Sequence, residues 1–101
     1  MSRVLVGTVF ELPDGAQKVV ELGNDEVLVV HAGGHFYAID NICSHQELEI
    51  EGGPVEGRKI KCVHHGSWFD LETGQALNLP AARPVKTYRT VVEDGKVYLE
   101  S

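Results

Sequence analysis

Glycine-containing turns punctuate this chain at short intervals, and they constrain its fold more than any other feature. Pairs such as Asp14-Gly15, Gly33-Gly34 and Asp94-Gly95 belong to a series of turn signals spaced roughly 8 to 12 residues apart, with short runs of β-branched residues between them. No apolar stripe with helical spacing extends beyond one turn. The chain is therefore expected to be all-β, a small antiparallel β sandwich or barrel.

The positions of the strands follow from these runs. Residues 26–31 are rich in valine and are expected to form a central strand, and Gly33-Gly34 predicts a hairpin to the next one. Strands are expected over residues 4–8, 18–22, 26–31, 35–40, 58–62, 68–71, 85–93 and 96–100. Between residues 41 and 57 the alternation fails, apart from a single helical turn at 46–48, and a loop is expected there.

Length and charge limit the classes of function. The 101 residues are enough for one domain, residues 1–101, and too few for two well-buried cores. A formal net charge of −6 disfavours binding to nucleic acid or to an anionic membrane surface and favours a basic protein partner. The sequence lacks the pattern of a signal peptide and any apolar run long enough to cross a bilayer, which predicts a cytoplasmic protein.

Two cysteines, each followed closely by histidine, carry the chemistry. One loop contains Cys43-Ser44-His45, and after sixteen further residues a second contains Cys62-Val63-His64-His65. Thiolates with imidazoles suit either zinc or an iron–sulfur cluster. Structural zinc sites usually bring both cysteines together in one knuckle, whereas here each loop offers one cysteine and histidine. This division favours a Rieske centre, in which two histidines replace two cysteines on one iron, over zinc.

The sequence resembles the Rieske ferredoxins, the small electron carriers of bacterial aromatic-ring-hydroxylating oxygenase systems. The resemblance rests on Cys43-Ser44-His45, on Cys62-Val63-His64-His65-Gly66, on the Phe69-Asp70…Thr73-Gly74 turn and on the proline-containing loop before the last strands. It covers essentially the whole chain. It implies a Rieske fold, an antiparallel β sandwich whose two loops form a cluster-binding subdomain over about residues 41–84.

The same resemblance implies the ligands of one Rieske-type [2Fe-2S] cluster. Cys43 and Cys62 would hold the inner iron, and His45 and His65 would bind the outer iron through Nδ1. His64 is interpreted as an exposed neighbour of the ligands, because only His65 preserves the family's C-x-x-H-G pattern.

The implied function is that of a one-electron carrier without catalytic turnover of its own. It would pass electrons from an NAD(P)H-dependent ferredoxin reductase to the terminal oxygenase of an aromatic-ring-hydroxylating dioxygenase system, and a monomer is expected of such a shuttle. Three alternatives remain open: the ferredoxin of an aromatic monooxygenase, a protein like the small subunit of nitrite reductase, and a zinc-stabilised interaction module.

Features around the two loops bear on potential and partners. Quinol-oxidising Rieske proteins carry a serine and a tyrosine hydroxyl that donate to the cluster; Ser67 matches the serine, but Phe69 replaces the tyrosine, so a low potential is expected. Trp68 could pack under the cluster or lie at the docking face, and we expect packing in the core. Residues 79–84 are expected to cover the cluster as a third loop, although packing alone would also explain them. Acidic residues in the first loop, namely Glu47, Glu49, Glu51 and Glu56, would steer a basic partner.

Overall fold

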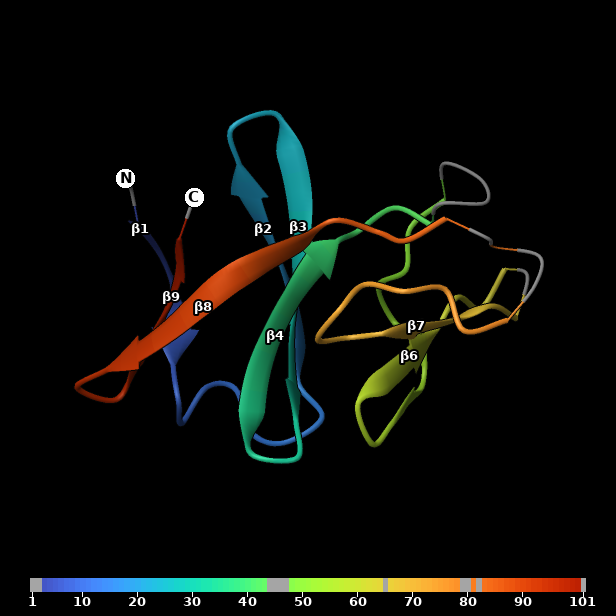
Figure 1. Ribbon diagram of the computed structural model, residues 1–101. Coiled ribbons are helices and arrows are strands. Elements are labelled where there is room, and N and C mark those ends of the chain that lie inside the picture. The colour runs from blue at the N-terminus through green and yellow to red at the C-terminus, as the bar shows by residue number, and fades with distance from the viewer. Residues whose placement is uncertain (1–2, 44–47, 65, 79–80, 82, 101) are drawn as a thin grey trace.

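The computed structural model describes residues 3–43, 48–64, 66–78, 81 and 83–100 (Figure 1). Within these residues the chain forms nine strands and no helix, which confirms the all-β prediction. The strands are β1 (Arg3–Thr8), β2 (Gln17–Leu22), β3 (Asp25–Ala32), β4 (His35–Asp40), β5 (Val55–Glu56), β6 (Lys59–Lys61), β7 (Trp68–Asp70), β8 (Thr87–Glu93) and β9 (Lys96–Glu100). The described part of the chain accordingly offers no helix that could span a membrane.

Six of these strands form the larger sheet, called the base sheet below. Their order is β1-β9-β8-β4-β3-β2, and every neighbouring pair is antiparallel. The predicted hairpin between β3 and β4 is confirmed: Gly33 and Gly34 both have positive φ, at 59° and 84°, which a two-residue turn of this kind requires. Pairing of β1 with β9 brings the two ends of the chain together, as Figure 1 shows.

A second, smaller sheet in the order β5-β6-β7 lies to one side of the base sheet (Figure 1). The segments after β4 and before β8 connect the two sheets. Strand β5 was not predicted, because only two residues, Val55 and Glu56, pair with β6 and so short a segment shows no alternation. The helical turn expected at 46–48 lies largely outside the described residues, although Leu48 is described.

Strand β3 is an interior strand of the base sheet, between β4 and β2, and this confirms the prediction that it is not an edge strand. Its residues 27–30 are buried almost completely, and successive side chains point to opposite faces of the strand. Leu28 and Val30 belong to a buried cluster shared with the small sheet and its loops, whereas Val27 and Val29 pack with residues of β1 and β9. Burial of each such side chain contributes about 1.5 to 3 kcal/mol to folding, so β3 stabilises both halves of the protein.

Gly74 permits a close approach between the turn after β7 and the segment before β8. Its φ is +78°, and a Cβ built there would lie 2.1 Å from the carbonyl oxygen of Val85. In return the amide of Val85 donates to the carbonyl of Gly74 at 2.8 Å. Only glycine allows this contact, which ties the small sheet to the base sheet.

Candidate metal centre

Cys43 lies three residues beyond β4, at the start of the first loop. Its side chain is buried, and its amide donates to the carbonyl of Leu48 at 2.8 Å. Just before it, the buried side chain of Asn41 joins this loop to β3: its Nδ2 donates to Glu26 at 3.3 Å, and its Oδ1 accepts from the amide of Glu51 at 2.9 Å. Sequence reasoning missed Asn41, because its partners are distant in the chain.

Cys62 directly follows β6 and opens the second loop. It is fully buried, and its amide donates to the carbonyl of Ser67 at 2.7 Å, while its own carbonyl accepts from the amide of Gly66 at 2.8 Å. These two backbone bonds close a tight turn over residues 62–67. Val63 and His64 inside this turn are exposed, which agrees with the interpretation of His64 as an exposed neighbour.

The two cysteines belong to one buried cluster and are not joined by a disulfide. Their neighbours in it include Leu28, Ile50 and Phe69. Two thiols in one buried apolar cluster, each at the start of a loop whose sequence carries a histidine, fit the inner half of a Rieske centre. His45 and His65 lie outside the described residues, so the four-ligand set stays a prediction; the described residues alone contain no group of three or more metal-ligating side chains.

Ser67 connects the second loop to the third. It is fully buried, and its Oγ accepts a hydrogen bond from the amide of Ala81 at 3.0 Å, so its own hydroxyl hydrogen is left to donate elsewhere. Ala81 is buried in the cysteine cluster, which supports a third loop packed over that site. Residues 79, 80 and 82, which belong to the same expected loop, lie outside the described residues. Phe69 is fully buried and supplies no hydroxyl group.

Asn78 is a second anchor that sequence reasoning missed. Its Oδ1 accepts from the amide of Trp68 at 2.6 Å, and its Nδ2 donates to the carbonyl of Gly66 at 3.2 Å. One amide side chain thereby satisfies both backbone groups that flank Ser67. An asparagine before a proline-containing loop was the only signal in the sequence.

Trp68 contradicts the expectation that it packs in the core. On β7 it is only half-buried, whereas its neighbour Phe69 is fully buried. Successive residues of a strand point to opposite faces, and Phe69 pairs with the buried Ile60 of β6. The indole of Trp68 therefore lies on the outer face of the small sheet.

Acidic side chains of the first loop are exposed where the structure describes them. Glu49, Glu51 and Glu56 all face solvent, and Glu47 lies outside the described residues. Asp70 at the end of β7 differs from them. Partial burial would raise the pKa of its carboxyl group, but hydrogen bonds from the amides of Thr73 and Glu72 and the charge of Arg58 outweigh burial and lower that pKa.

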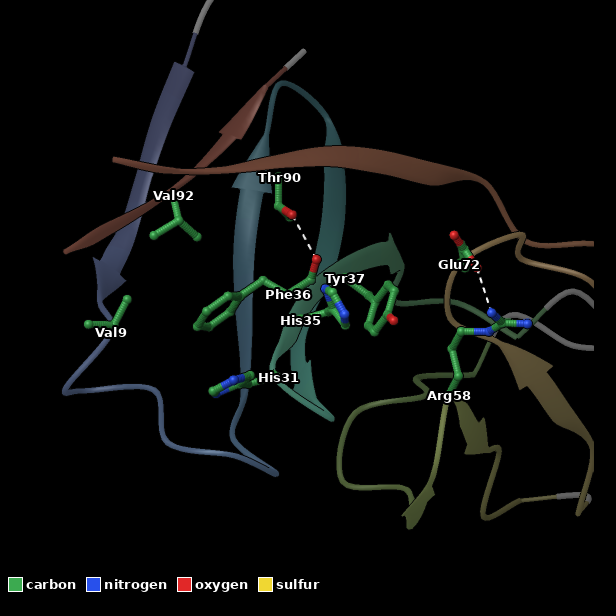
Figure 2. A pocket seen from close by; sticks show the side chains of 10 residues that line it. Val9, His31, His35, Phe36, Tyr37, Arg58, Glu72, Thr90 and Val92 are labelled. Atoms are coloured by element: carbon green, nitrogen blue, oxygen red, sulfur yellow. Dashed lines mark hydrogen bonds and ion pairs between the residues drawn. The ribbon is translucent and has the colours of Figure 1, made fainter. Parts of the chain in front are cut away.

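A cavity of about 710 Å³ lies beside the N-terminal half of β4, and its lining does not include either cysteine (Figure 2). His31 and His35 contribute to it. The ring of His31 stacks on Phe36 at a centroid distance of 4.1 Å, and its Nδ1 donates to the carbonyl of Leu12 at 2.7 Å. These two histidines have structural partners of their own and are not part of the predicted ligand set.

Comparison with known families decides between zinc and an iron–sulfur cluster. Residues 2–89 match the Rieske [2Fe-2S] domain family. The chain belongs to this family. Its cofactor is therefore a Rieske-type [2Fe-2S] cluster, as expected.

Individual relatives of this Rieske chain are electron carriers. It is 44% identical over 98% of its length to the 3-phenylpropionate/cinnamic acid dioxygenase ferredoxin subunit of Photorhabdus laumondii, and the match covers 94% of that protein. Among solved structures, the ferredoxin of carbazole 1,9a-dioxygenase from Nocardioides aromaticivorans is 34% identical, with a TM-score of 0.92 and coverage of 98% and 97% of the two chains.

A third comparison concerns an assembly. A structure described as a complex of reduced oxygenase and oxidized ferredoxin in carbazole 1,9a-dioxygenase contains a chain that is 26% identical to this one, with a TM-score of 0.90. The match covers 96% of this chain and 91% of that chain. These findings confirm the resemblance to ferredoxins of aromatic-ring dioxygenase systems, and with it the role of electron carrier rather than enzyme.

Proposed function

We propose that this chain carries single electrons from an NAD(P)H-dependent reductase to the terminal oxygenase of an aromatic-ring-hydroxylating dioxygenase system. The observation that carries the proposal is the burial of Cys43 and Cys62, from two separate loops, in one apolar cluster. The partners are proposed from the ferredoxin subunits to which the chain is similar.

Within this proposal, Cys43, His45, Cys62 and His65 hold the cluster. A bound Rieske cluster takes up and releases one electron at a potential between about −150 and +300 mV. The two buried cysteines would occupy its inner side, which leaves the histidines to complete the outer side. Two neutral imidazoles in place of two thiolates remove two negative charges from the ligand set, and this favours the added electron.

Second-loop residues tune the potential. Ser67 is buried with its hydroxyl hydrogen available, whereas Phe69 offers no hydrogen-bond donor. Hydrogen bonds to the cysteine sulfurs and the sulfides stabilise the reduced cluster. Because one such donor is missing at Phe69, the reduction potential should lie toward the negative end of the range for Rieske centres. Ala81 of the third loop is buried, and its amide contacts Ser67. This packing limits the access of water to the proposed cluster site.

We also propose that the chain works as a monomer in the cytoplasm. A shuttle must present the same exposed surface to a donor and then to an acceptor, and a permanent partner copy on that surface would block exchange. The exposed carboxylates of Glu49, Glu51 and Glu56 would accelerate encounters with a basic partner surface in a salt-dependent way.

Electron paramagnetic resonance of the purified, dithionite-reduced protein tests this proposal. A reduced signal whose average g value lies clearly below the free-electron value is expected, with about two irons and two sulfides per chain. The reduced protein should then pass one electron to an oxygenase component of such a system. A colourless protein that holds zinc and no sulfide after anaerobic purification would contradict the proposal and favour an interaction module.

A further inference from the structure

The outer face of β6 and β7 carries two partly buried lysines around the half-buried indole of Trp68. Lys61 pairs directly with Trp68 in the register of these strands, and Lys59 lies two residues away on the same face. The Nζ atoms of Lys59 and Lys61 lie 4.8 Å and 5.9 Å from the centroid of the Trp68 ring. Both distances are within the range of cation–π attraction, so the indole holds two ammonium groups close together. We call these three residues the β6–β7 patch.

This patch gathers two of the nine basic residues of a chain that has fifteen acidic ones. Across the described ranges, no lysine forms an ion pair, these two included, whereas arginines do: Arg3 contacts Glu93 and Glu100. Glu56 and Asp70 face Lys59 in the register of the sheet, yet neither pairs with it.

The carboxylate of Asp70 accepts hydrogen bonds from groups other than Lys59. Its Oδ2 accepts from Arg58 at 3.3 Å, and its Oδ1 accepts from the amides of Glu72 and Thr73 at 2.8 Å and 3.1 Å. Arg58 in turn contacts Glu72 at 2.7 Å. This network of one arginine and two carboxylates carries a net negative charge beside the Lys59 end of β6, so the excess of positive charge lies at the Lys61 end.

The position of the patch relates it to electron transfer. Lys61 directly precedes Cys62, and Trp68 directly follows Ser67, so the patch borders the second loop on both sides. Two exposed apolar residues lie close to it along the backbone: Val63 is two residues after Lys61, and the amide of Leu77 donates to the carbonyl of Trp68 at 2.8 Å. The exposed carboxylates of Glu49 and Glu51 belong instead to the first loop.

We propose that the β6–β7 patch docks a carboxylate-bearing surface of one redox partner protein, with an apolar side chain of that partner against Trp68, Val63 and Leu77. This inference rests on the proposed function and deepens it, since it assigns opposite charges to the two sides of the site. The occupant follows from charge complementarity: two unpaired ammonium groups held by an indole attract carboxylates, and exclusion of water by the apolar rim strengthens that attraction. A partner with a basic surface would use the first loop instead.

Charge reversal of the patch tests this inference. The double variant Lys59→Glu/Lys61→Glu is compared with Arg89→Glu/Lys96→Glu, which changes the net charge equally at exposed positions of β8 and β9. Stopped-flow traces follow, separately, cluster reduction by the reductase and cluster oxidation by the oxygenase. At low ionic strength, patch reversal should slow one of these two reactions by about tenfold or more, while the control changes that reaction less than about twofold.

Further variants separate charge from structure. Lys59→Arg/Lys61→Arg should retain the wild-type rate and its decrease with salt, and Lys59→Gln/Lys61→Gln should abolish most of the salt dependence of the affected reaction. The Lys59→Gln/Lys61→Gln variant also tests the inference if the Lys59→Glu/Lys61→Glu variant does not fold. Equal slowing by the patch and control variants, or no slowing of either reaction, would overturn the inference.

The failure of the inference is distinguishable from that of the proposed function. A wild-type protein that lacks the Rieske signal, or that exchanges electrons with neither partner, contradicts the proposed function itself. A wild-type protein that transfers electrons while the patch variants behave like the control contradicts only the docking surface. Sedimentation that shows a wild-type dimer, dissociated by the patch reversal, would assign the patch to a second copy of this chain and overturn the proposal of a redox partner.

Discussion

The base sheet and the proposed cluster-binding region, the described residues between 41 and 84, are stabilised in different ways. Base strands have five to eight residues and, apart from the two-residue pairing of β4 with β8, pair over five or six residues each. One of their two buried clusters contains no residue from the region. The described strands of the region have only two or three residues, and its loops depend on single side chains such as Asn41, Ser67 and Asn78. Backbone pairing and apolar burial thus hold the scaffold, while individual hydrogen bonds shape the site.

Removal of a proposed cluster ligand should have the largest effect, and it should disturb the proposed cluster-binding region while leaving the base sheet folded. In Cys62→Ala the cluster should be lost completely, because three remaining ligands cannot complete both irons. The apolar cluster around Val29 and Leu99 contains no part of the region, so the base sheet should keep its hydrogen-exchange protection. Visible absorption and exchange monitored by mass spectrometry measure the two effects.

A histidine pair provides the control for this experiment. His65→Ala should also lose the cluster, whereas His64→Ala should retain it in full. Retention in His65→Ala and loss in His64→Ala would reverse the assignment of the ligand. Equal loss of protection in both sheets of Cys62→Ala would instead mean that the two regions unfold as one unit.

Gly74→Ala should weaken the junction between the regions by about 3 to 4 kcal/mol. An alanine at φ +78° is strained, and its Cβ would lie 2.1 Å from the Val85 carbonyl oxygen, so strain and overpacking add. Gly15→Ala, in the turn before β2, is the matched control: its φ is +90°, but no atom lies within 4 Å of the added Cβ, and a loss of about 1 kcal/mol is expected. Urea unfolding measures both, and equal losses would refute the role of the close approach.

These contrasts also explain how much could be predicted from sequence. Strand β3 and its hairpin were predictable because valine-rich residues and paired glycines are local signals. The cysteines were predictable as a site because their spacing to histidine is also local. The side-chain partners of Asn41 and Asn78 depend on contacts made only after folding, and they left no local pattern.

The failure at Trp68 has a different physical cause. Alternation places Trp68 with Asp70 on one face of the strand and Phe69 with Leu71 on the other, so it favours Phe69 as the buried aromatic residue; the expectation for Trp68 rested on the large apolar indole alone. Pairing of Phe69 with the buried Ile60 decides the question in favour of Phe69.

Leucine truncations on the two sides of the base sheet sharpen the comparison further. Leu28→Ala and Leu99→Ala both remove a fully buried leucine, and each should cost about 3 kcal/mol. Only Leu28 lies in the cluster that contains the cysteines, so only its truncation should accelerate release of iron to a chelator. Bleaching of the visible absorption measures this release. Equal acceleration by both variants would show that global unfolding, rather than local loosening, limits cluster loss.

The smallest expected effect concerns Tyr88, where the base sheet meets the region. Its hydroxyl donates to Asp40 at the end of β4, and partial burial together with this hydrogen bond raises the pKa of Tyr88. Tyr88→Phe should cost about 1 kcal/mol at neutral pH. Because the unfolded chain loses the tyrosine proton near pH 10 while the folded chain retains it, this contribution is complete below pH 10 and declines as the pH rises above it. Urea midpoints should therefore converge for wild type and Tyr88→Phe above pH 10, and a constant difference would mean that the bond to Asp40 does not set the pKa.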